Sequence, residues 1–174
     1  MSEATPAPLS GPTSGLVYGD VPNRIFAYII DAIVLIFINI VVAIPLAVFM
    51  SGLLGSIIAT VISLAIGGVY FVYTWTRMRA TLGMRALSLQ IGTAPGGETI
   101  TTDQAIRRWL ALGAAFSIAS VLASALPVIG LLIGLAAFAW FIFLLVTTAQ
   151  SPTKQGWHDV FANTMVVKAA KSVG

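Results

Sequence analysis

A run of almost uninterrupted apolar residues extends from Trp109 to Thr148. About 20 apolar residues cross the hydrocarbon core of a bilayer as a helix, so this run is roughly twice as long as one span requires. Pro127 divides the run near its middle, within the segment ALPVIG. We therefore expect two transmembrane helices, at about 109–126 and 128–148, joined by a tight turn.

Two further apolar runs lie earlier in the chain, at about 25–50 and 56–75. The first contains Pro45, where we expect a kink, and the second ends in YFVYTW, which is typical of an interfacial aromatic belt. Only 9% of the 174 residues are charged, whereas a soluble domain carries about 25%. The sequence predicts an all-α membrane protein, built as a four-helix transmembrane bundle.

The basic residues lie on one side of these expected spans. Arg24 precedes the first helix, lysines at 154, 168 and 171 follow the last, and five arginines lie between the second and third: Arg77, Arg79, Arg85, Arg107 and Arg108. The other two loops hold no charge. By the positive-inside rule, both termini and the middle loop are expected to be cytoplasmic, in a multi-pass protein of the cell membrane.

The segments outside the spans have compositions of their own. Residues 1–21 are rich in Pro, Ser, Gly and Ala, which predicts a disordered cytoplasmic tail and not a signal peptide. Residues 22–168 form the expected membrane domain, and 169–174 a short tail. In the middle loop, RALSLQIG, TAPGG and ETI together predict a small cytoplasmic β-hairpin, to which NTMVVKAA adds a strand. Thr101 and Gln104 have the spacing of a capping box.

Polar residues line one face of the first helix. Arg24, Tyr28, Asp31, Leu35 and Asn39 fall on one stripe at 3.6 residues per turn. An ionised side chain in a membrane helix costs about 2.5–3.5 kcal/mol on insertion scales, so this stripe should face the bundle interior. Asp31 then either binds a proton or a small cation, with oxygen ligands from Tyr28 and Asn39, or forms a structural ion pair with an arginine. The candidate partners are Arg24, Arg107 and Arg108.

Asp159 lies about ten residues beyond the last expected helix, in GWHDVF. We expect it at the cytoplasmic surface, paired with one of three arginines: Arg77, Arg79 or Arg85. The neighbouring His158, the one histidine of the chain, is interpreted as a surface residue. The five arginines of the middle loop form a basic cluster that can contact anionic lipid headgroups.

Several classes of function are disfavoured by the sequence. The chain has no cysteine, and it contains no phosphate-binding loop, zinc motif or nucleophile elbow. We therefore expect no enzyme, no bound metal and no cofactor. The basic residues flank apolar segments and do not cluster in a soluble domain, so we expect membrane lipids and not nucleic acid as partners.

Four motifs in their order resemble the RDD family of small bacterial membrane proteins. They are NRIFAYIIDAIV, TLGMRALSLQIG, the arginine pair before the third helix, and QGWHDVFANTMVV, and the resemblance covers about 22–168. The arginine and two aspartates that name the family would be Arg24, Asp31 and Asp159. The family commonly has Thr-x-Gly-Lys-Arg in the middle loop, and this chain has Met84 in place of that lysine. It also has four expected spans, where many members are described with three.

The resemblance implies two classes of function. Some members of the family are proposed to exchange monovalent cations for protons, which would make this chain a small oligomeric transporter with Asp31 as its coupling carboxylate. Alternatively, the protein is a non-transporting membrane scaffold or the accessory subunit of a larger membrane complex. In either case we expect a homo-oligomer or a subunit of a membrane complex.

Overall fold

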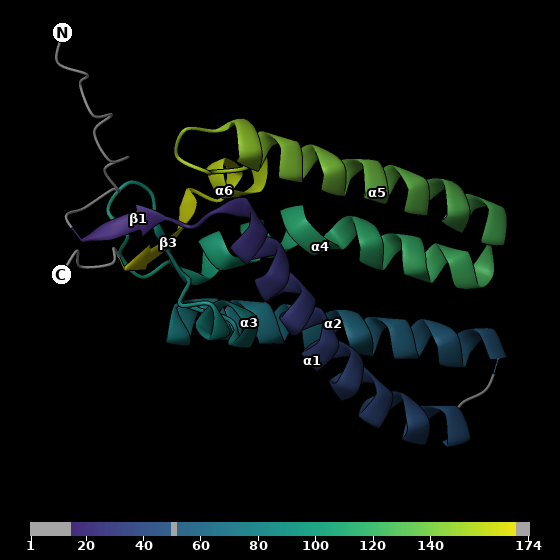
Figure 1. Cartoon of the computed structure of the whole chain (residues 1–174). Coiled ribbons are helices and arrows are strands. Elements are labelled where there is room, and N and C mark those ends of the chain that lie inside the picture. The colour runs from purple at the N-terminus through teal and green to yellow at the C-terminus, as the bar shows by residue number, and fades with distance from the viewer. Residues whose placement is uncertain (1–14, 50–51, 170–174) are drawn as a thin grey trace, which may run out of the picture.

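Four long helices account for most of the protein, whose computed structural model describes residues 15–49 and 52–169. They are α1 (Val21–Phe49), α2 (Gly52–Met78), α4 (Thr102–Ala125) and α5 (Pro127–Gln150) (Figure 1). Helix α1 begins earlier than expected because Pro22 suits a first turn and Asp20 supports it. The Asp20 carboxylate accepts a hydrogen bond from Asn23 (2.8 Å), and its backbone oxygen accepts one from the Arg24 amide.

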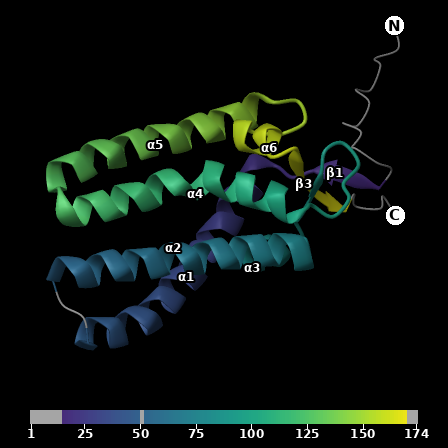
Figure 2. The same cartoon turned by 180° about the vertical axis from the view of Figure 1, so that it is seen from behind.

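The long helices are arranged as two pairs. Helices α4 and α5 lie side by side, α4 also packs against α2, and α1 runs obliquely across α2 (Figures 1 and 2). The turn between α4 and α5 falls at Pro127, as predicted, because proline is accommodated at the first position of a helix. This turn lies at the end of the molecule farthest from the β-strands (Figure 2).

The outer surfaces of these helices are apolar. Large exposed side chains include Ile33 and Phe37 on α1, Val69 on α2 and Leu131 on α5. Within the described residues, three helical segments are long and apolar enough to cross a membrane: Val21–Leu46, Leu54–Met78 and Val128–Gln150. Helix α4 has a similar length, but the side chains of residues 114–125 are outside the described set. The number of four spans therefore stays a prediction.

A small layer of short elements lies at the opposite end of the bundle from the α4–α5 turn (Figure 1). It contains β1 (Leu16–Tyr18), α3 (Leu82–Ala86), β2 (Gln90–Thr93), α6 (Trp157–Phe161) and β3 (Thr164–Ala169). The three strands form an antiparallel sheet in the order β1-β3-β2. Leu16 is opposite Ala169, and Gln90 is opposite Val167. The start, middle and end of the described chain therefore meet in one sheet.

The sheet differs from the predicted hairpin. The pairing of the NTMVVKAA segment with the middle loop is confirmed, but ETI (98–100) forms no strand, and β2 pairs with β3. The chain turns sharply after β2, where the Thr93 amide donates to the Glu98 oxygen (2.9 Å). The predicted tail of residues 1–21 is too long, because Leu16–Tyr18 is strand β1; residues 1–14 are outside the described set.

The best-packed core lies where the short elements meet the helix ends. Leu89, Ile91 and Val166 are buried there together with Trp75 and Met84. The predicted capping box at the start of α4 is confirmed. The Thr101 hydroxyl accepts from the Gln104 amide (3.2 Å), and the Gln104 side chain accepts from the Thr101 amide (2.9 Å). This cap fixes the point at which α4 leaves the small layer.

Candidate functional site

Asp31 lies in α1 and is only 2% exposed. Its carboxylate accepts hydrogen bonds from the Tyr70 hydroxyl (2.6 Å), the Thr81 hydroxyl (2.5 Å) and the Gly83 amide (2.8 Å). Tyr70 belongs to α2, Thr81 is the N-cap of α3, and Gly83 is in α3. Asp31 therefore connects three helices through neutral donors.

The predicted ion pair between Asp31 and an arginine is wrong. Among the described residues no cationic group lies within ion-pair distance of Asp31, because the start of α3 occupies its oxygens. Arg24 and Arg108 bind Asp159, and Arg107 pairs with Asp103 one helical turn away (2.9 Å).

The segment Thr81-x-Gly83 explains why α3 can approach Asp31 so closely. The Thr81 hydroxyl accepts from the Met84 amide (3.1 Å) while donating to Asp31, so it caps α3 and binds the carboxylate at once. A Cβ atom on Gly83 would lie 2.0 Å from the Ala27 backbone oxygen. Only glycine fits there. Met84 is buried in the core, where an apolar side chain is suited.

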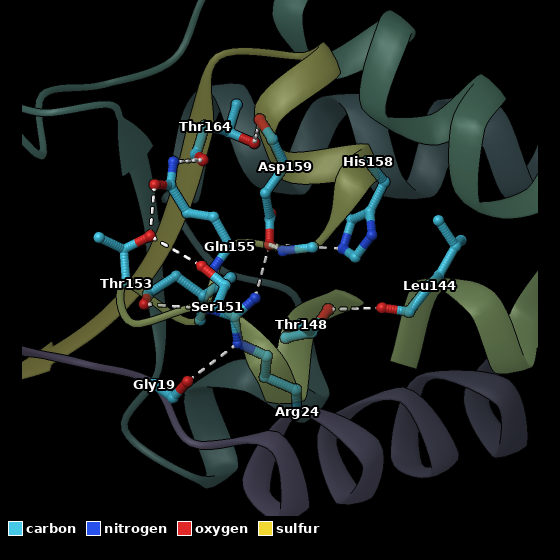
Figure 3. A network of polar contacts seen from close by, with 12 residues as sticks. Gly19, Arg24, Leu144, Thr148, Ser151, Thr153, Gln155, His158, Asp159 and Thr164 are labelled. Carbon is cyan, nitrogen blue, oxygen red and sulfur yellow. Dashed lines mark hydrogen bonds and ion pairs between the residues drawn. The ribbon is translucent and has the colours of Figure 1, made fainter. Parts of the chain in front are cut away.

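Asp159 occupies a second polar centre and is completely buried (Figure 3). One oxygen accepts from Arg24 Nη1 (2.7 Å) and the Gly156 amide (3.1 Å), and the other is paired with Arg108 Nη1. The predicted surface position of Asp159 is wrong, because α6 turns back beneath the ends of α1 and α4. Two guanidinium groups thus share one carboxylate, which leaves this centre with one unit of excess positive charge.

The two arginines also fasten the strands to the helices. Arg24 Nε donates to the Gly19 oxygen (3.0 Å), and Arg24 Nη2 donates to the Val166 oxygen of β3 (3.4 Å). Arg108 donates to the Thr164 hydroxyl (2.8 Å) and lies over the Trp75 ring, 5.3 Å from its centroid. The centre at Asp159 therefore joins α1, α4, α6 and β3.

The middle-loop arginines do not act as one group. Arg77, Arg85 and Arg107 are exposed, whereas Arg79 donates to the Gly97 oxygen. Arg108 is buried, so its assignment to a lipid-facing cluster is wrong. The predicted pairing of Asp159 with Arg77, Arg79 or Arg85 is also wrong. The carboxylate pairs with arginines of α1 and α4 instead.

His158 is also buried, contrary to its predicted place at the surface. Its Nε2 lies 3.5 Å from an Asp159 oxygen that already binds Arg24. Burial, followed by the positive charges of Arg108 and Arg24, holds the pKa of His158 well below its usual range. The imidazole is therefore neutral in the folded protein at neutral pH.

Acidification is expected to destabilise the protein through His158. In the unfolded chain its pKa is ordinary, about 6.5, so the unfolded state binds a proton first as the pH falls. Stability contributed by the neutral imidazole is present above pH 6.5 and decreases by roughly 1 kcal/mol between about pH 6.5 and 5.5. Thermal unfolding in detergent at several pH values measures this loss. His158→Gln should flatten the dependence in that range; an unchanged slope would contradict the assignment.

Tyr28 and Asn39 do not hydrogen bond to Asp31. The Tyr28 ring stacks on Phe71, with centroids 6.5 Å apart, and the Asn39 amide donates to the Leu35 backbone oxygen (2.8 Å). The partners of Asp31 that sequence reasoning missed are Tyr70, Thr81 and Gly83. A signal for two of them was present, because TLG combines an N-cap residue with a glycine directly after the second span.

A cavity of about 350 Å³ connects the two polar centres. Arg24, Asp31, Arg108 and His158 all line it, and most of its remaining wall is apolar. Across the described residues, no group of three or more His, Cys, Asp or Glu side chains is placed to hold a metal ion. The arrangement offers hydrogen-bond donors and one excess positive charge at one end of an apolar space.

Comparison with protein-family models places this sequence in a known family. The model of the RDD family matches residues 18–163, which include Arg24, Asp31 and Asp159. The matched range also includes all four long helices, and it ends just before β3. Comparison with curated proteins and with solved structures finds no match.

Proposed function

This chain belongs to the RDD family, and from that premise we propose that it is a non-transporting scaffold or accessory subunit in the cell membrane. Family membership, together with three helices able to cross a bilayer, makes it an integral membrane protein. We further propose that it crosses the membrane four times, works as a homo-oligomer or within a larger complex, and catalyses no reaction.

One observation supports this proposal: both buried carboxylates are already bound by other groups of the protein. Asp31 is bound by Tyr70, Thr81 and Gly83, and Asp159 by two arginines. A carboxylate that couples cation and proton movement has to exchange its ligands in each cycle. Here that exchange would detach α3 from α1, or leave buried guanidinium groups unpaired. The geometry favours a fastening role for both residues.

Cation–proton exchange is the second candidate. It is favoured by the position of Asp31, which lines the cavity of about 350 Å³ from a membrane-spanning helix. Intramembrane carboxylates commonly belong to ion or proton pathways. In a transporter, Asp31 would exchange its ligands when a cation gradient is applied. In a scaffold, Asp31 would keep its hydrogen bonds.

Proton flux in liposomes separates the candidates. We expect purified wild type to move no more protons than empty liposomes when Na⁺, K⁺ or Li⁺ is added. Asp31→Asn should lower thermal stability by about 1–3 kcal/mol, because an amide cannot accept all three hydrogen bonds. Asp103→Asn, at an exposed ion pair, is the matched control. Cation-dependent flux in the wild type that disappears in a folded Asp31→Asn would favour the transporter instead.

The small layer is proposed to face the cytoplasm, with both termini on that side. Its support is the location of Arg77, Arg85 and Arg107 near the layer, since exposed arginines concentrate in cytoplasmic loops. These three side chains are also the ones available to anionic lipid headgroups.

Labelling of introduced cysteines tests this orientation, and the chain has no native cysteine to interfere. In intact cells, a membrane-impermeant maleimide should label Leu126→Cys, at the exposed turn between α4 and α5. Arg77→Cys should be labelled only after permeabilisation, with a contrast of at least about tenfold. Equal labelling of both variants in intact cells would reject the four-span orientation.

A further inference from the structure

Three residues that line the cavity between the helices each have a buried nitrogen atom with no hydrogen-bond partner. Trp75 Nε1, Arg108 Nε and His158 Nδ1 make no hydrogen bond within the described structure. Their residues are 3%, 5% and 7% exposed, and all three line the same cavity. Buried polar atoms are nearly always paired, so unpaired nitrogens on three residues of one cavity wall point to a missing hydrogen-bonding group.

The chemistry of these atoms defines the head of a ligand. Trp75 Nε1 and Arg108 Nε can only donate hydrogen bonds, so the missing group offers acceptor oxygens to these two atoms. His158 Nδ1 accepts when the neutral ring carries its proton on Nε2, which faces Asp159. The excess positive charge of the Arg24, Arg108 and Asp159 centre favours an anionic head. Asp31 also lines the cavity, and its neutral donors Tyr70, Thr81 and Gly83 leave its negative charge in place. An anionic head is therefore expected beside Arg108 and not beside Asp31.

The rest of the cavity fits a hydrocarbon chain. Phe71, Leu112, Phe141 and Leu145 form part of its apolar wall. Tyr28 and Ile29 also line it and remain 41% and 47% exposed on a membrane-spanning helix. The wall thus reaches the surface of α1 at membrane depth, where an acyl chain can enter from the bilayer.

We propose that this cavity binds an acyl-chain amphipath with an anionic oxygen head, either a carboxylate or a phosphate, taken up from the bilayer. Arg108 Nε and Trp75 Nε1 donate to the head, while the apolar wall covers the first part of the chain. This inference goes beyond the scaffold role and does not depend on it, because a folded scaffold with an empty cavity would still fasten its helices through Asp31 and Asp159.

Binding to delipidated protein in detergent tests the proposal, with native mass spectrometry as the readout. Palmitate and dioleoyl phosphatidic acid are the two anionic probes, and they distinguish a fatty acid from a phospholipid. Hexadecanol supplies the chain without the charge, and inorganic phosphate supplies the charge without the chain. We expect at least one anionic amphipath to bind at least tenfold more tightly than hexadecanol, and phosphate alone not to bind.

Two variants locate the bound molecule. Leu112→Trp fills the cavity and should weaken binding at least tenfold, whereas Ile33→Trp, at an exposed α1 side chain outside the cavity, should leave it unchanged. Trp75→Phe keeps the ring beneath Arg108 but removes one donor, and should weaken binding several-fold. Circular dichroism and gel filtration verify that each variant is folded.

Photolabelling of the wild type is independent of any variant's ability to fold. Palmitate with a diazirine on its chain should label peptides that contain Phe71, Leu112 or Phe141. Labels confined to outward-facing residues such as Ile33 would overturn the proposal. Equal binding of palmitate, phosphatidic acid and hexadecanol would also overturn it. Binding of inorganic phosphate alone would identify a soluble anion as the ligand and reject uptake from the bilayer.

Discussion

Asp159→Asn is expected to lower the free energy of unfolding by roughly 3–5 kcal/mol, the usual effect of breaking a buried ion pair. The substitution leaves two buried guanidinium groups, those of Arg24 and Arg108, without a negative charge. Small domains are stable by only about 5–15 kcal/mol, so this loss removes a large share of the total stability and should lower the amount of folded protein in the membrane. Thermal unfolding in detergent and the amount of inserted protein measure the effect.

A second substitution tests whether unpaired positive charge causes this loss of stability. Adding Arg108→Met to Asp159→Asn removes one of the two stranded charges, and should recover part of the lost stability. Asp103→Asn breaks an exposed pair with Arg107 and should change stability by at most about 1 kcal/mol. If the double variant is no more stable than Asp159→Asn, the explanation by unpaired charge is wrong.

Gly83→Ala is expected to destabilise the protein by about 3 kcal/mol, at the upper end of overpacking effects. The added methyl group would lie 2.0 Å from the Ala27 oxygen, and that oxygen is held within α1. Helix α3 would have to retreat, which would break the hydrogen bond from the Gly83 amide to Asp31. Chemical unfolding followed by circular dichroism provides the measurement.

Gly96→Ala is the matched control for this prediction. Gly96 is exposed, and a Cβ atom there would meet only the Glu98 side chain, at 3.7 Å. Its effect should stay within about 0.5 kcal/mol, as at most surface positions. A Gly83→Ala protein as stable as Gly96→Ala would show that α3 can shift without loss, and that the contact with Ala27 is not a constraint.

The positions of the long helices could be predicted because each is specified locally. An apolar run of sufficient length predicts a helix, and Pro127 indicates where two helices must be separated. The capping box of Thr101 and Gln104 is equally local, and it was found where expected. The pairing of β3 with β2 was also predictable, since both segments have strand character.

The partners of the buried carboxylates could not be predicted in the same way. Asp31 meets Gly83, 52 positions away, and Asp159 meets Arg24 across 135 positions. Charge alone suggested arginines for both aspartates, but only Asp159 has them. Neutral donors from Tyr70 and Thr81 satisfy Asp31 instead. Which donor reaches which acceptor depends on how α3 and α6 turn back onto the bundle. A local pattern such as TLG indicates where α3 begins, but not which carboxylate it meets.

The sheet order has a consequence for how the protein is made. Strand β3 is central, so β1 and β2 have no partner until the last described residues have been synthesised. Arg24 likewise waits for Asp159, 135 residues later, and at about 5–20 residues per second the delay is roughly 7 to 27 s. Throughout that interval the nascent chain contains Arg24 without its carboxylate and β1 without its partner strand, and β2 joins them once residue 93 has been made. A chain that ends before Asp159 lacks both the carboxylate for Arg24 and the central strand, so it can complete neither the buried ion pair nor the sheet.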